Sequence, residues 1–367
     1  MASKKILISA AEVSGDVHGC ALARELKKLS PDIFLYGMGG EKMRAAGVDV
    51  RLDITEYSTI GLLEALTYLP RQFAAFRFMV TLLKKDRPDI LVLIDAQGFN
   101  VPLAKAAKKL GIKTCYYIAP QEWLWGTPKN AKIIAETLDK IIAIFEEEYK
   151  IYKNFGANVV YNGHPLLDIV KTSSAKEETR NSIAICPGSR RQEFKHLLPI
   201  LLEAAKMLHA KFPDLEFVIP LSSPRFRPLL KNILGRSLLP VKIIEGHTYD
   251  VLAHSRLALA ASGTIVLESV ILNTPVIMAY KLSMFTEFIG KKILGIKLPF
   301  YSMPNLLANE NIVTELVQKN CSPEKIYAEA VELLKNPQKQ TLRFPKILKT
   351  LGQSGAIQKA AEELLKM

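Results

Sequence analysis

A short stretch of small and basic residues has the composition of an anion-binding turn. Residues 187–194 read PGSRRQEF and directly follow the apolar run 183–186, which is typical of a buried strand. A helix that begins after such a strand offers unpaired backbone N–H groups and the positive end of its dipole. Ser189 adds a hydroxyl group, and Arg190 and Arg191 add guanidinium groups that match phosphate oxygens. The stretch predicts a phosphate site, although an ordinary strand–helix turn with exposed arginines would contain the same residue types.

A second candidate turn lies in the same half of the chain. Ser262, Gly263 and Thr264 precede the helical pattern 265–272, where small residues and hydroxyls could form another anion site. Glu268 follows one turn later and could accept hydrogen bonds from a ribose diol. A capped helix with a hydroxyl in its first turn would look the same. Two such turns near two arginines nevertheless favour the diphosphate of a nucleotide.

Other ligand signatures are incomplete. Residues 37–40 read GMGG between a predicted strand and a predicted helix, but Lys42 occupies the place of the third glycine in G-x-G-x-x-G. The P-loop and H-E-x-x-H patterns are absent, and the histidines show no metal-ligand spacing. We therefore expect neither a cofactor nor a metal ion.

Short apolar runs that alternate with amphipathic runs indicate how these turns are positioned. Strands are predicted at 6–10, 33–36, 90–94, 114–118, 140–144 and 159–161 and, after the polar segment 171–181, at 183–186, 216–220, 242–244, 257–260 and 275–279. Strands that are apolar on both faces and alternate with helices predict two parallel sheets, which bind ligands at the carboxyl ends of their strands. In the first half those ends carry chemically active residues: Glu12, Ser14, Gly15 and Asp16, then Asp95, then residues 120–123.

The composition fits a folded protein of two domains, because 367 residues exceed the length that one core usually serves. A net charge of +13 is consistent with nucleic acid, an anionic membrane surface or phosphorylated substrates, and also with a lysine-rich surface. Nucleic acid is disfavoured, because no binding module is recognisable. Four scattered cysteines favour a reducing cytoplasm, and no apolar run reaches the length of about 18 residues that predicts a transmembrane helix.

One helical pattern, within residues 58–85, carries an unusually wide apolar stripe. Its positions step by four and three residues and include Leu62, Leu66, Leu69, Phe73 and Phe76. Basic residues flank the stripe, and Pro70 is expected to divide the segment into two helices. The stripe predicts either a pair of core helices or a basic amphipathic surface that contacts anionic lipids.

Eight sequence blocks in order resemble the lipid A disaccharide synthase family from end to end. In the first half they are AEVSGD (11–16), G-M-G-G-x-x-M (37–43), IDA (94–96) with Phe99 and Asn100, P-x-x-W-x-W (120–125) and NGHP (162–165). In the second half they are P-G-S-R-x-x-E (187–193), A-S-G-T-x-x-L-E (261–268) and PNLLA (304–308). The number and order of the blocks make the resemblance specific, whereas the two donor-side blocks alone would also suit other nucleotide-sugar enzymes.

The resemblance implies a GT-B fold of two facing Rossmann-like domains, without a required metal. It implies an inverting transfer from UDP-2,3-diacylglucosamine to 2,3-diacylglucosamine 1-phosphate through a β-1,6 bond, with release of UDP. Arg190 would bind the diphosphate, the turn at residues 262–264 would form the opposite cradle, and Glu268 would hold the ribose. Asn305 and Gln318 would close the donor pocket. The expected location is the cytoplasmic face of the inner membrane, as a peripheral monomer or homodimer.

The expected domains are an acceptor and membrane-facing domain (1–170), a donor domain (171–345) and a C-terminal helix (346–367) that returns to the first domain. One residue departs from the resembled family: Gly98 stands where D-x-P-D-F-N has its second Asp. Asp95 is therefore the expected base, with partial burial raising its pKa, and Glu12 would assist or position sugar hydroxyls. His18 is a third candidate that could simply face solvent. A UDP-sugar 2-epimerase and a catalytically weakened membrane-associated binding protein are the alternatives.

Overall fold

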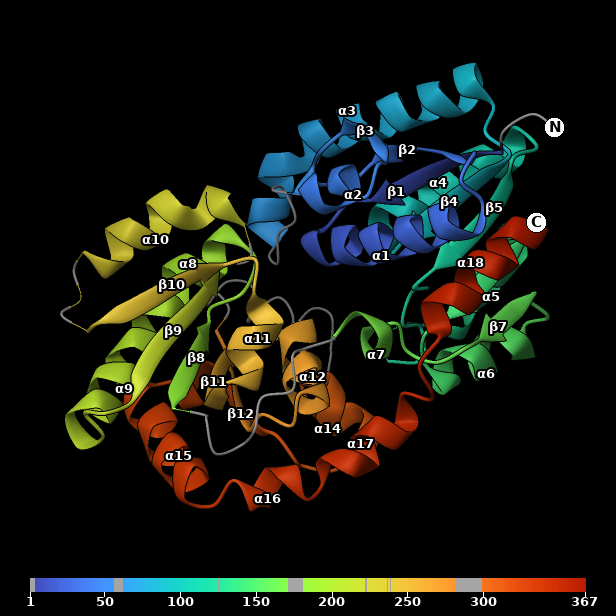
Figure 1. The fold of residues 1–367 in the computed structure, drawn as a ribbon. Helices are drawn as coiled ribbons and strands as arrows, with labels where there is room; N and C mark the ends of the chain where they lie inside the picture. The colour runs from blue at the N-terminus through green and yellow to red at the C-terminus, as the bar shows by residue number, and fades with distance from the viewer. Residues whose placement is uncertain are drawn as a thin grey trace. The chain divides into compact units, whose positions relative to one another are not determined.

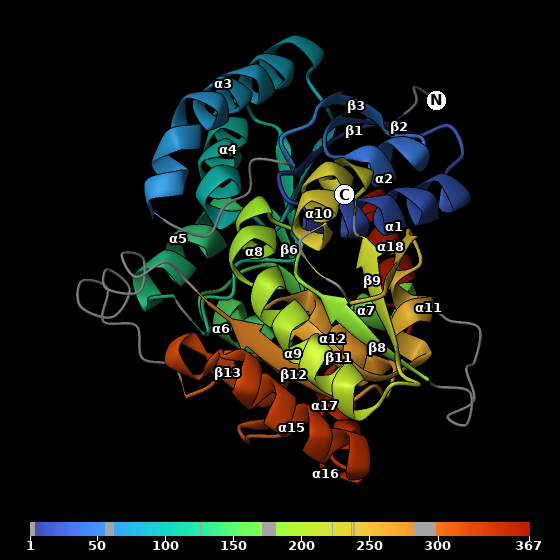
Figure 2. The same ribbon diagram turned by 90° about the vertical axis from the view of Figure 1, so that its left-hand side faces the viewer.

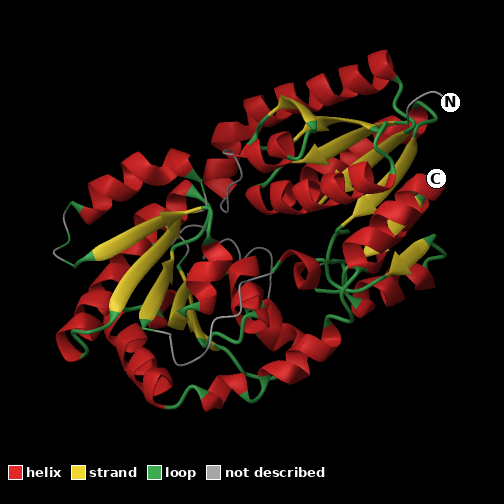
Figure 3. Ribbon diagram, in the orientation of Figure 1, coloured by secondary structure: helices red, strands yellow, loops and turns green. Residues whose placement is uncertain are grey.

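The computed structural model describes residues 4–55, 62–124, 126–170, 181–221, 223–235, 237, 239–281 and 299–367 (Figure 1). The chain forms two compact units. The first unit comprises Met1–Ile169 and Leu351–Met367, and the second comprises Val170–Thr350. Each unit has its own parallel sheet with helices on both faces, as the alternation of apolar and amphipathic runs predicts (Figure 3).

The first unit contains a seven-stranded sheet in the order β3-β2-β1-β4-β5-β6-β7. Its strands are β1 (Lys5–Ala10), β2 (Phe34–Met38), β3 (Asp49–Leu52), β4 (Ile90–Ile94), β5 (Lys113–Tyr117), β6 (Lys140–Ala143) and β7 (Val159–Tyr161). Its helices are α1 (Val13–Leu29), α2 (Glu41–Ala45), α3 (Leu62–Asp86), α4 (Gln97–Lys109), α5 (Pro128–Thr137), α6 (Glu146–Asn154), α7 (Leu166–Ile169) and α18 (Ala356–Lys366). Because every β4 side chain is buried, this strand needs cover on both faces.

The two faces of this sheet are covered by different helices. One face packs Leu7, Leu91 and Leu93 against side chains of α3, α4, α5 and α6 in a single hydrophobic cluster. Figure 2 shows α3 and α4 on one side of the sheet and α1 on the other. Helix α18 lies against α1, and Lys140 of β6 forms an ion pair with Glu363 of α18.

The second unit contains a six-stranded sheet in the order β10-β9-β8-β11-β12-β13. Its strands are β8 (Ser182–Cys186), β9 (Glu216–Leu221), β10 (Val241–Glu245), β11 (Ser255–Ala261), β12 (Val276–Tyr280) and β13 (Thr314–Val317). Its helices include α8 (Arg191–His196), α9 (Leu198–Lys211), α10 (Arg227–Leu234), α11 (Thr248–Ala253), α12 (Thr264–Ile271), α14 (Met303–Ala308), α15 (Pro323–Lys335), α16 (Gln338–Thr341) and α17 (Phe344–Thr350), with short 3₁₀ turns η3 (Pro224–Phe226) and η4 (Gln318–Asn320). Apolar side chains of α8, α9 and α15 cover one face of this sheet.

The segment after α17 belongs to the first unit although it follows the second along the chain. The backbone N–H of His164 donates to the carbonyl of Leu351 at 2.8 Å. The Asp168 carboxylate accepts hydrogen bonds from the N–H groups of Gly355 (2.6 Å) and Ile357 (3.0 Å), so a residue of α7 caps the start of α18. The chain therefore crosses between the units twice.

Two helices differ from the sequence prediction. The amphipathic run of the sequence predicts a helix over 19–29, whereas helix α1 begins at Val13, which places Ser14, Gly15 and Asp16 in its first turns. Helix α3 continues through Pro70 instead of dividing there. A proline removes one backbone donor and strains one turn, and the bonds of the flanking turns suffice to keep this helix continuous.

Candidate functional site

The turn from β8 into α8 is built around Glu193. Its carboxylate Oε2 accepts hydrogen bonds from the N–H groups of Ser189 (2.8 Å) and Arg190 (3.0 Å), and Arg190 Nη1 lies 3.3 Å from Oε1. Gly188 has φ +113°, and a Cβ there would lie 1.9 Å from Glu193 Oε2, so only glycine fits this turn. The backbone N–H groups of Ser189 and Arg190 are therefore bonded to a carboxylate of the protein itself. The Arg190 guanidinium is paired with the same carboxylate through Nη1, and the neighbouring Arg191 is exposed.

The turn from β11 into α12 lies beside it at the carboxyl edge of the sheet. Strands β8 and β11 are neighbours, with Cys186 paired with Ala260. Gly263 has φ +149° and open space at its Cβ position, and both Gly263 and Thr264 are exposed. This helix start is therefore accessible, as an anion site requires.

Glu268 lies inward from that helix start and is buried. Burial raises the pKa of the Cys186 thiol, and the Glu268 charge raises it further, so Glu268 lies close to the end of β8. Burial raises the pKa of Tyr249 in α11, and the Glu268 charge raises it further. The structure thus brings the second turn's acid to the strand that leads into the first turn.

Sequence reasoning missed Tyr280, the last residue of β12. Burial raises the pKa of its hydroxyl; Glu193 raises it further and Arg190 lowers it, which places Tyr280 in the electrostatic neighbourhood of the α8 turn. Its partner across the ladder to β13 is Val317, directly before Gln318. Gln318 has φ +55°, a strained conformation for a non-glycine residue. An alternation pattern marks where β12 ends but does not show which distant side chain lies beside it.

Asn305, which is expected to close the donor pocket, is bonded within its own loop. It is fully buried, and its Oδ1 accepts from the N–H groups of Ile312 and Val313, both at 2.8 Å. Its Nδ2 donates to the Val313 carbonyl and to Glu315 Oε1, also at 2.8 Å each. These bonds occupy the amide, so Asn305 holds the loop that leads into β13.

In the first unit, Glu12 and Asp95 follow adjacent strands, since Ala10 of β1 is paired with Ile94 of β4. Glu12 is the residue that precedes helix α1, and its side chain is half-buried. Asp95 is exposed, so the partial burial expected of it is not observed. Its Oδ1 accepts from the N–H of Ala96 at 2.8 Å, as in a carboxylate that caps the turn after β4.

The backbone around Asp95 is strained and tightly held. Asp95 and Ala96 have φ values of +51° and +49°, and Ile118, at the end of the neighbouring strand, has +64°. Such conformations cost energy and persist only where surrounding contacts impose them. Here the Tyr116 hydroxyl (2.7 Å) and Asn100 Nδ2 (2.8 Å) both donate to the Asp95 carbonyl. The carboxyl ends of β4 and β5 are therefore fixed in an unusual geometry.

Asp16 contributes to the fold of the same edge. Its carboxylate accepts from the N–H groups of Gly40 (2.7 Å), Lys42 (3.0 Å) and Met43 (3.0 Å), which fixes the start of α2. A Cβ at Gly40 would lie 2.7 Å from this carboxylate. The glycines after β2 thus allow close packing, and the substrate contact expected of Asp16 would have to share oxygens that already accept three bonds.

A buried polar cluster lies behind this edge. Glu148 accepts at 2.9 Å from the N–H of Ile144, and burial raises its pKa to about 8. His18 is buried rather than facing solvent, and burial lowers its pKa to about 4. Both groups are neutral near pH 7 and are poorly placed to exchange protons with solvent.

The apolar stripe of α3 is partly exposed. Leu69 and Phe73 are 50% and 64% exposed, respectively. Phe76 differs from the expectation, because it packs against the core cluster with its ring edge-on to an aromatic ring of α4. The side chains of Leu62 and Leu66 lie outside the described residues. Among the described side chains of α3, the exposed large apolar ones are Leu69, Phe73 and Phe78, with exposed Arg71 and Arg77 on the same helix.

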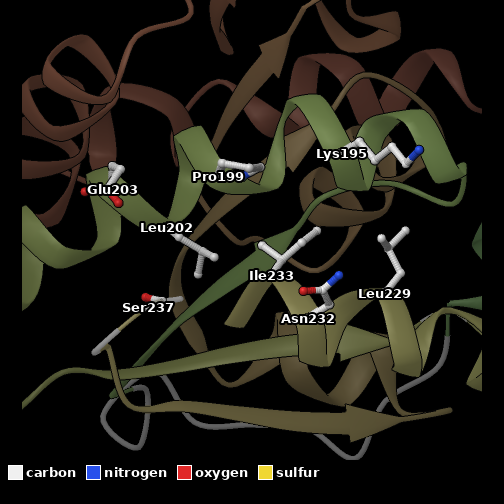
Figure 4. Close-up of a pocket in the computed structure, with 8 residues that line it drawn as sticks. All are labelled: Lys195, Pro199, Leu202, Glu203, Leu229, Asn232, Ile233 and Ser237. Carbon is white, nitrogen blue, oxygen red and sulfur yellow. The ribbon is translucent and has the colours of Figure 1, made fainter. Parts of the chain in front are cut away.

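A cavity of about 370 Å³ lies elsewhere in the second unit, between α10 and the helices α8 and α9 (Figure 4). It is lined by Lys195, Pro199, Leu202, Glu203, Leu229, Asn232, Ile233 and Ser237. None of the predicted donor-site residues is among these, so the cavity is not assigned to the reaction.

Two features are absent from the described part of the chain. No helix there is long and apolar enough to span a membrane. No group of three or more His, Cys, Asp or Glu side chains there could hold a metal ion.

The architecture places the protein among two-domain enzymes of the GT-B fold. A UDP-N-acetylglucosamine 2-epimerase from Neisseria meningitidis, solved with UDP-GlcNAc, matches with a TM-score of 0.64 and 14% identity and covers 100% of both chains. A calicheamicin glycosyltransferase matches with a TM-score of 0.60 and 16% identity, over 100% of this chain and 98% of the other. These likenesses establish the fold.

Sequence similarity establishes the family. The chain belongs to the lipid-A-disaccharide synthetase family, whose match spans residues 6–366. A lipid-A-disaccharide synthase from Persephonella marina is 39% identical, with 98% of both chains covered. The corresponding enzyme from Gloeothece citriformis is 36% identical, over 98% of this chain and 99% of the relative.

Proposed function

We propose that this protein is an inverting glycosyltransferase of lipid A biosynthesis. It joins UDP-2,3-diacylglucosamine to 2,3-diacylglucosamine 1-phosphate through a β-1,6 bond and releases UDP. The observation that carries this proposal is family membership over almost the whole chain, together with relatives named for this synthase. The two-unit fold, which a neighbour solved with UDP-GlcNAc shares, supports a nucleotide-sugar donor.

The donor site is proposed at the carboxyl edge of the second sheet. Arg190 binds the diphosphate and stabilises the charge that develops on it as the bond to the sugar breaks. The accessible start of α12, at Ser262, Gly263 and Thr264, provides a second set of donors. Glu268 accepts hydrogen bonds from the ribose. Gln318 directly follows β13, which is separated from β11 by β12 in the sheet.

Ser189 and Arg191 flank Arg190 and are proposed as secondary donor contacts. Glu193 supports them, because it holds the turn that aims the Arg190 side chain. Tyr280, beside this turn, is a further contact that the structure adds to the proposed set.

The acceptor site is proposed at the carboxyl edge of the first sheet. The acceptor hydroxyl loses its proton as its oxygen attacks the anomeric carbon, so a base must lie within hydrogen-bond reach. Asp95 is the proposed base, supported by its exposure and by the fixed backbone around it. Glu12, at the adjacent strand end, assists or orients sugar hydroxyls, with Ser14 and Gly15 nearby.

The base assignment is tested by the pH–rate profiles of Asp95→Asn and Glu12→Gln. Loss of the base should slow turnover by about 10²–10⁴-fold and abolish the acidic limb of the profile, with UDP binding intact. If neither substitution slows the enzyme by more than about tenfold, both assignments are wrong.

Peripheral attachment to the cytoplasmic face of the inner membrane is part of the proposal. Leu69 and Phe73 would insert among lipids, and the basic side chains of α3 would attract anionic headgroups. Such attachment would give the enzyme access to two acylated substrates.

Product analysis tests the proposed function against the alternatives. Purified protein incubated with both acylated substrates should yield a disaccharide and UDP. An epimerised UDP-sugar would instead identify an epimerase, and binding without any product would identify a nucleotide-sugar-binding protein.

A further inference from the structure

The first residue of α4, Gln97, is hydrogen-bonded to a carboxylate that follows another strand. Gln97 Nε2 donates a hydrogen bond to Oε1 of Glu122, which follows β5. Glu122 is only 4% exposed, and its Oε2 accepts from the N–H of Thr127 at 3.1 Å. A buried carboxylate requires such partners, and here one of them is an exposed side chain at the proposed acceptor edge.

Glu122 and Asp95 lie on either side of this turn. The charges of both carboxylates raise the pKa of Tyr116, after the larger effect of burial, so both lie in the neighbourhood of its hydroxyl. That hydroxyl donates to the Asp95 carbonyl at 2.7 Å. Gln97 is thus two residues from an exposed acid, Asp95, and hydrogen-bonded to a buried one, Glu122.

The neighbouring position, Gly98, leaves this turn without an acid of its own. A Cβ at Gly98 would meet no atom within 4 Å, and its φ lies outside the positive range that favours glycine. A side chain with a carboxylate would fit here without strain. The acid that does reach the turn is Glu122, through Gln97.

The Glu122 carboxylate decides which way the Gln97 amide faces. An ionised carboxylate can only accept hydrogen bonds, so it selects the amide nitrogen and turns the amide oxygen away. The charge also polarises the amide, which makes its oxygen a better acceptor. The result is an oriented acceptor oxygen on an exposed side chain two residues from Asp95.

We propose that Glu122 is a positioning residue of the acceptor site: it holds the Gln97 amide so that Oε1 accepts a hydrogen bond from the acceptor sugar beside the hydroxyl that Asp95 deprotonates. This inference rests on the proposed glycosyltransferase function. If Glu122 only supported the start of α5 through Thr127, its substitution would reduce the amount of folded protein and leave the acceptor kinetics of the folded enzyme unchanged.

The first variant is Glu122→Gln. Its amide can still accept from Thr127, but it can also donate to Gln97 Oε1 and so reverse the Gln97 amide. We expect kcat/KM for the acceptor to fall by about ten- to hundredfold, the range for a hydrogen bond to a charged group. KM for the UDP-sugar and the melting temperature should stay near wild type. The acidic limb of the pH–rate profile should persist, because Asp95 remains. Glu136→Gln, at an exposed acid of α5, is the matched control and should change nothing.

Two further measurements separate positioning from structural support. Because Glu122 and Gln97 act as one unit, the double variant with Gln97→Ala should lose no more activity than either single variant. Gly98→Asp in the Glu122→Gln background should recover part of the lost acceptor efficiency, because it places an acceptor oxygen on the same turn.

The inference is overturned if Glu122→Gln keeps wild-type acceptor kinetics. It is also overturned if the double variant loses activity by the product of the losses in Glu122→Gln and Gln97→Ala, or if activity falls only in proportion to the loss of folded protein. Failure of the proposed function would appear differently, as wild-type protein that forms no disaccharide and binds no acceptor in calorimetry.

Discussion

Arg190 is the residue on which the proposed donor chemistry depends most directly. The backbone N–H groups of Ser189 and Arg190 are bonded to Glu193, so the proposed diphosphate contact falls to the guanidinium groups, with Arg190 as the main one and Arg191 as a secondary one. Arg190→Ala should therefore lower kcat by about 10²–10³-fold, the usual cost of one donor that stabilises developing negative charge. Steady-state UDP release measures this. Lys195→Ala, at an exposed position of the same helix, is the control, and near-wild-type turnover in Arg190→Ala would eliminate the proposed role.

Glu148 predicts a pH dependence of stability in the first unit. Its pKa is about 8 in the folded protein, against a usual value of 4.5. Between these values the unfolded chain has released the proton and the folded chain retains it, so the free energy of unfolding falls as pH rises from about 4.5 to about 8. The Glu148→Gln variant should lack this pH-dependent fall in the free energy of unfolding, which amounts to about 1.4 kcal/mol per unit of pKa shift. Above pH 8 the variant should therefore be more stable than wild type.

Urea denaturation of both proteins across this pH range measures the difference, with Glu147→Gln in the same helical turn as the control. A wild-type-minus-variant difference that does not change with pH would contradict the assignment of a neutral Glu148.

At the residue scale, sequence patterns identified where the polar groups gather but not what each one contacts. Residues such as Asp16, Glu193 and Asn305 have types that suit ligands, and the structure shows them bonded to backbone groups. An acid near a helix start serves a cap and a ligand site equally well, and only the tertiary contacts distinguish the two. Tyr280 and Glu122 show the converse, because their neighbours come from other strands.

At the scale of single elements, α3 makes the clearest prediction. Replacement of Leu69 and Phe73 by Ser should weaken binding to anionic vesicles by about tenfold or more, since burial of such a side chain contributes on the order of 1.5–3 kcal/mol. Added salt should weaken the binding further, because it screens the arginines of this helix. Vesicle co-sedimentation measures this effect.

Leu342→Ser provides the matched control, because Leu342 is 77% exposed in the second unit. Equal binding of the double Ser variant and wild type would show that this surface does not contact lipid. A fall in melting temperature that accounts for the whole loss would instead favour a core role.

Element prediction succeeded where periodicity was strong and failed where short-range signals conflicted. The predicted strand positions match the central strands of both sheets, because these are buried on both faces and read as apolar runs. The edge strands β3 and β13 were missed, since each has four residues and includes polar ones. Helix α1 starts earlier than predicted because tertiary packing places Gly15 and Gly19 inside a helix, against their low propensity.

At the scale of the whole molecule, the sequence predicted two parallel α/β domains, and the structure and its neighbours confirm that fold class. Specificity for lipid A precursors could not come from the fold, because epimerases and other glycosyltransferases share it. It came from eight blocks in order, and family membership over residues 6–366 supports it.

The most direct test of the account is acceptor-dependent release of UDP by the purified wild-type protein. With UDP-2,3-diacylglucosamine alone, we predict almost no UDP release. When 2,3-diacylglucosamine 1-phosphate is added, UDP and a β-1,6-linked disaccharide should appear in equal amounts. UDP release that does not require the acceptor, or no disaccharide with both substrates present, would contradict the proposed function.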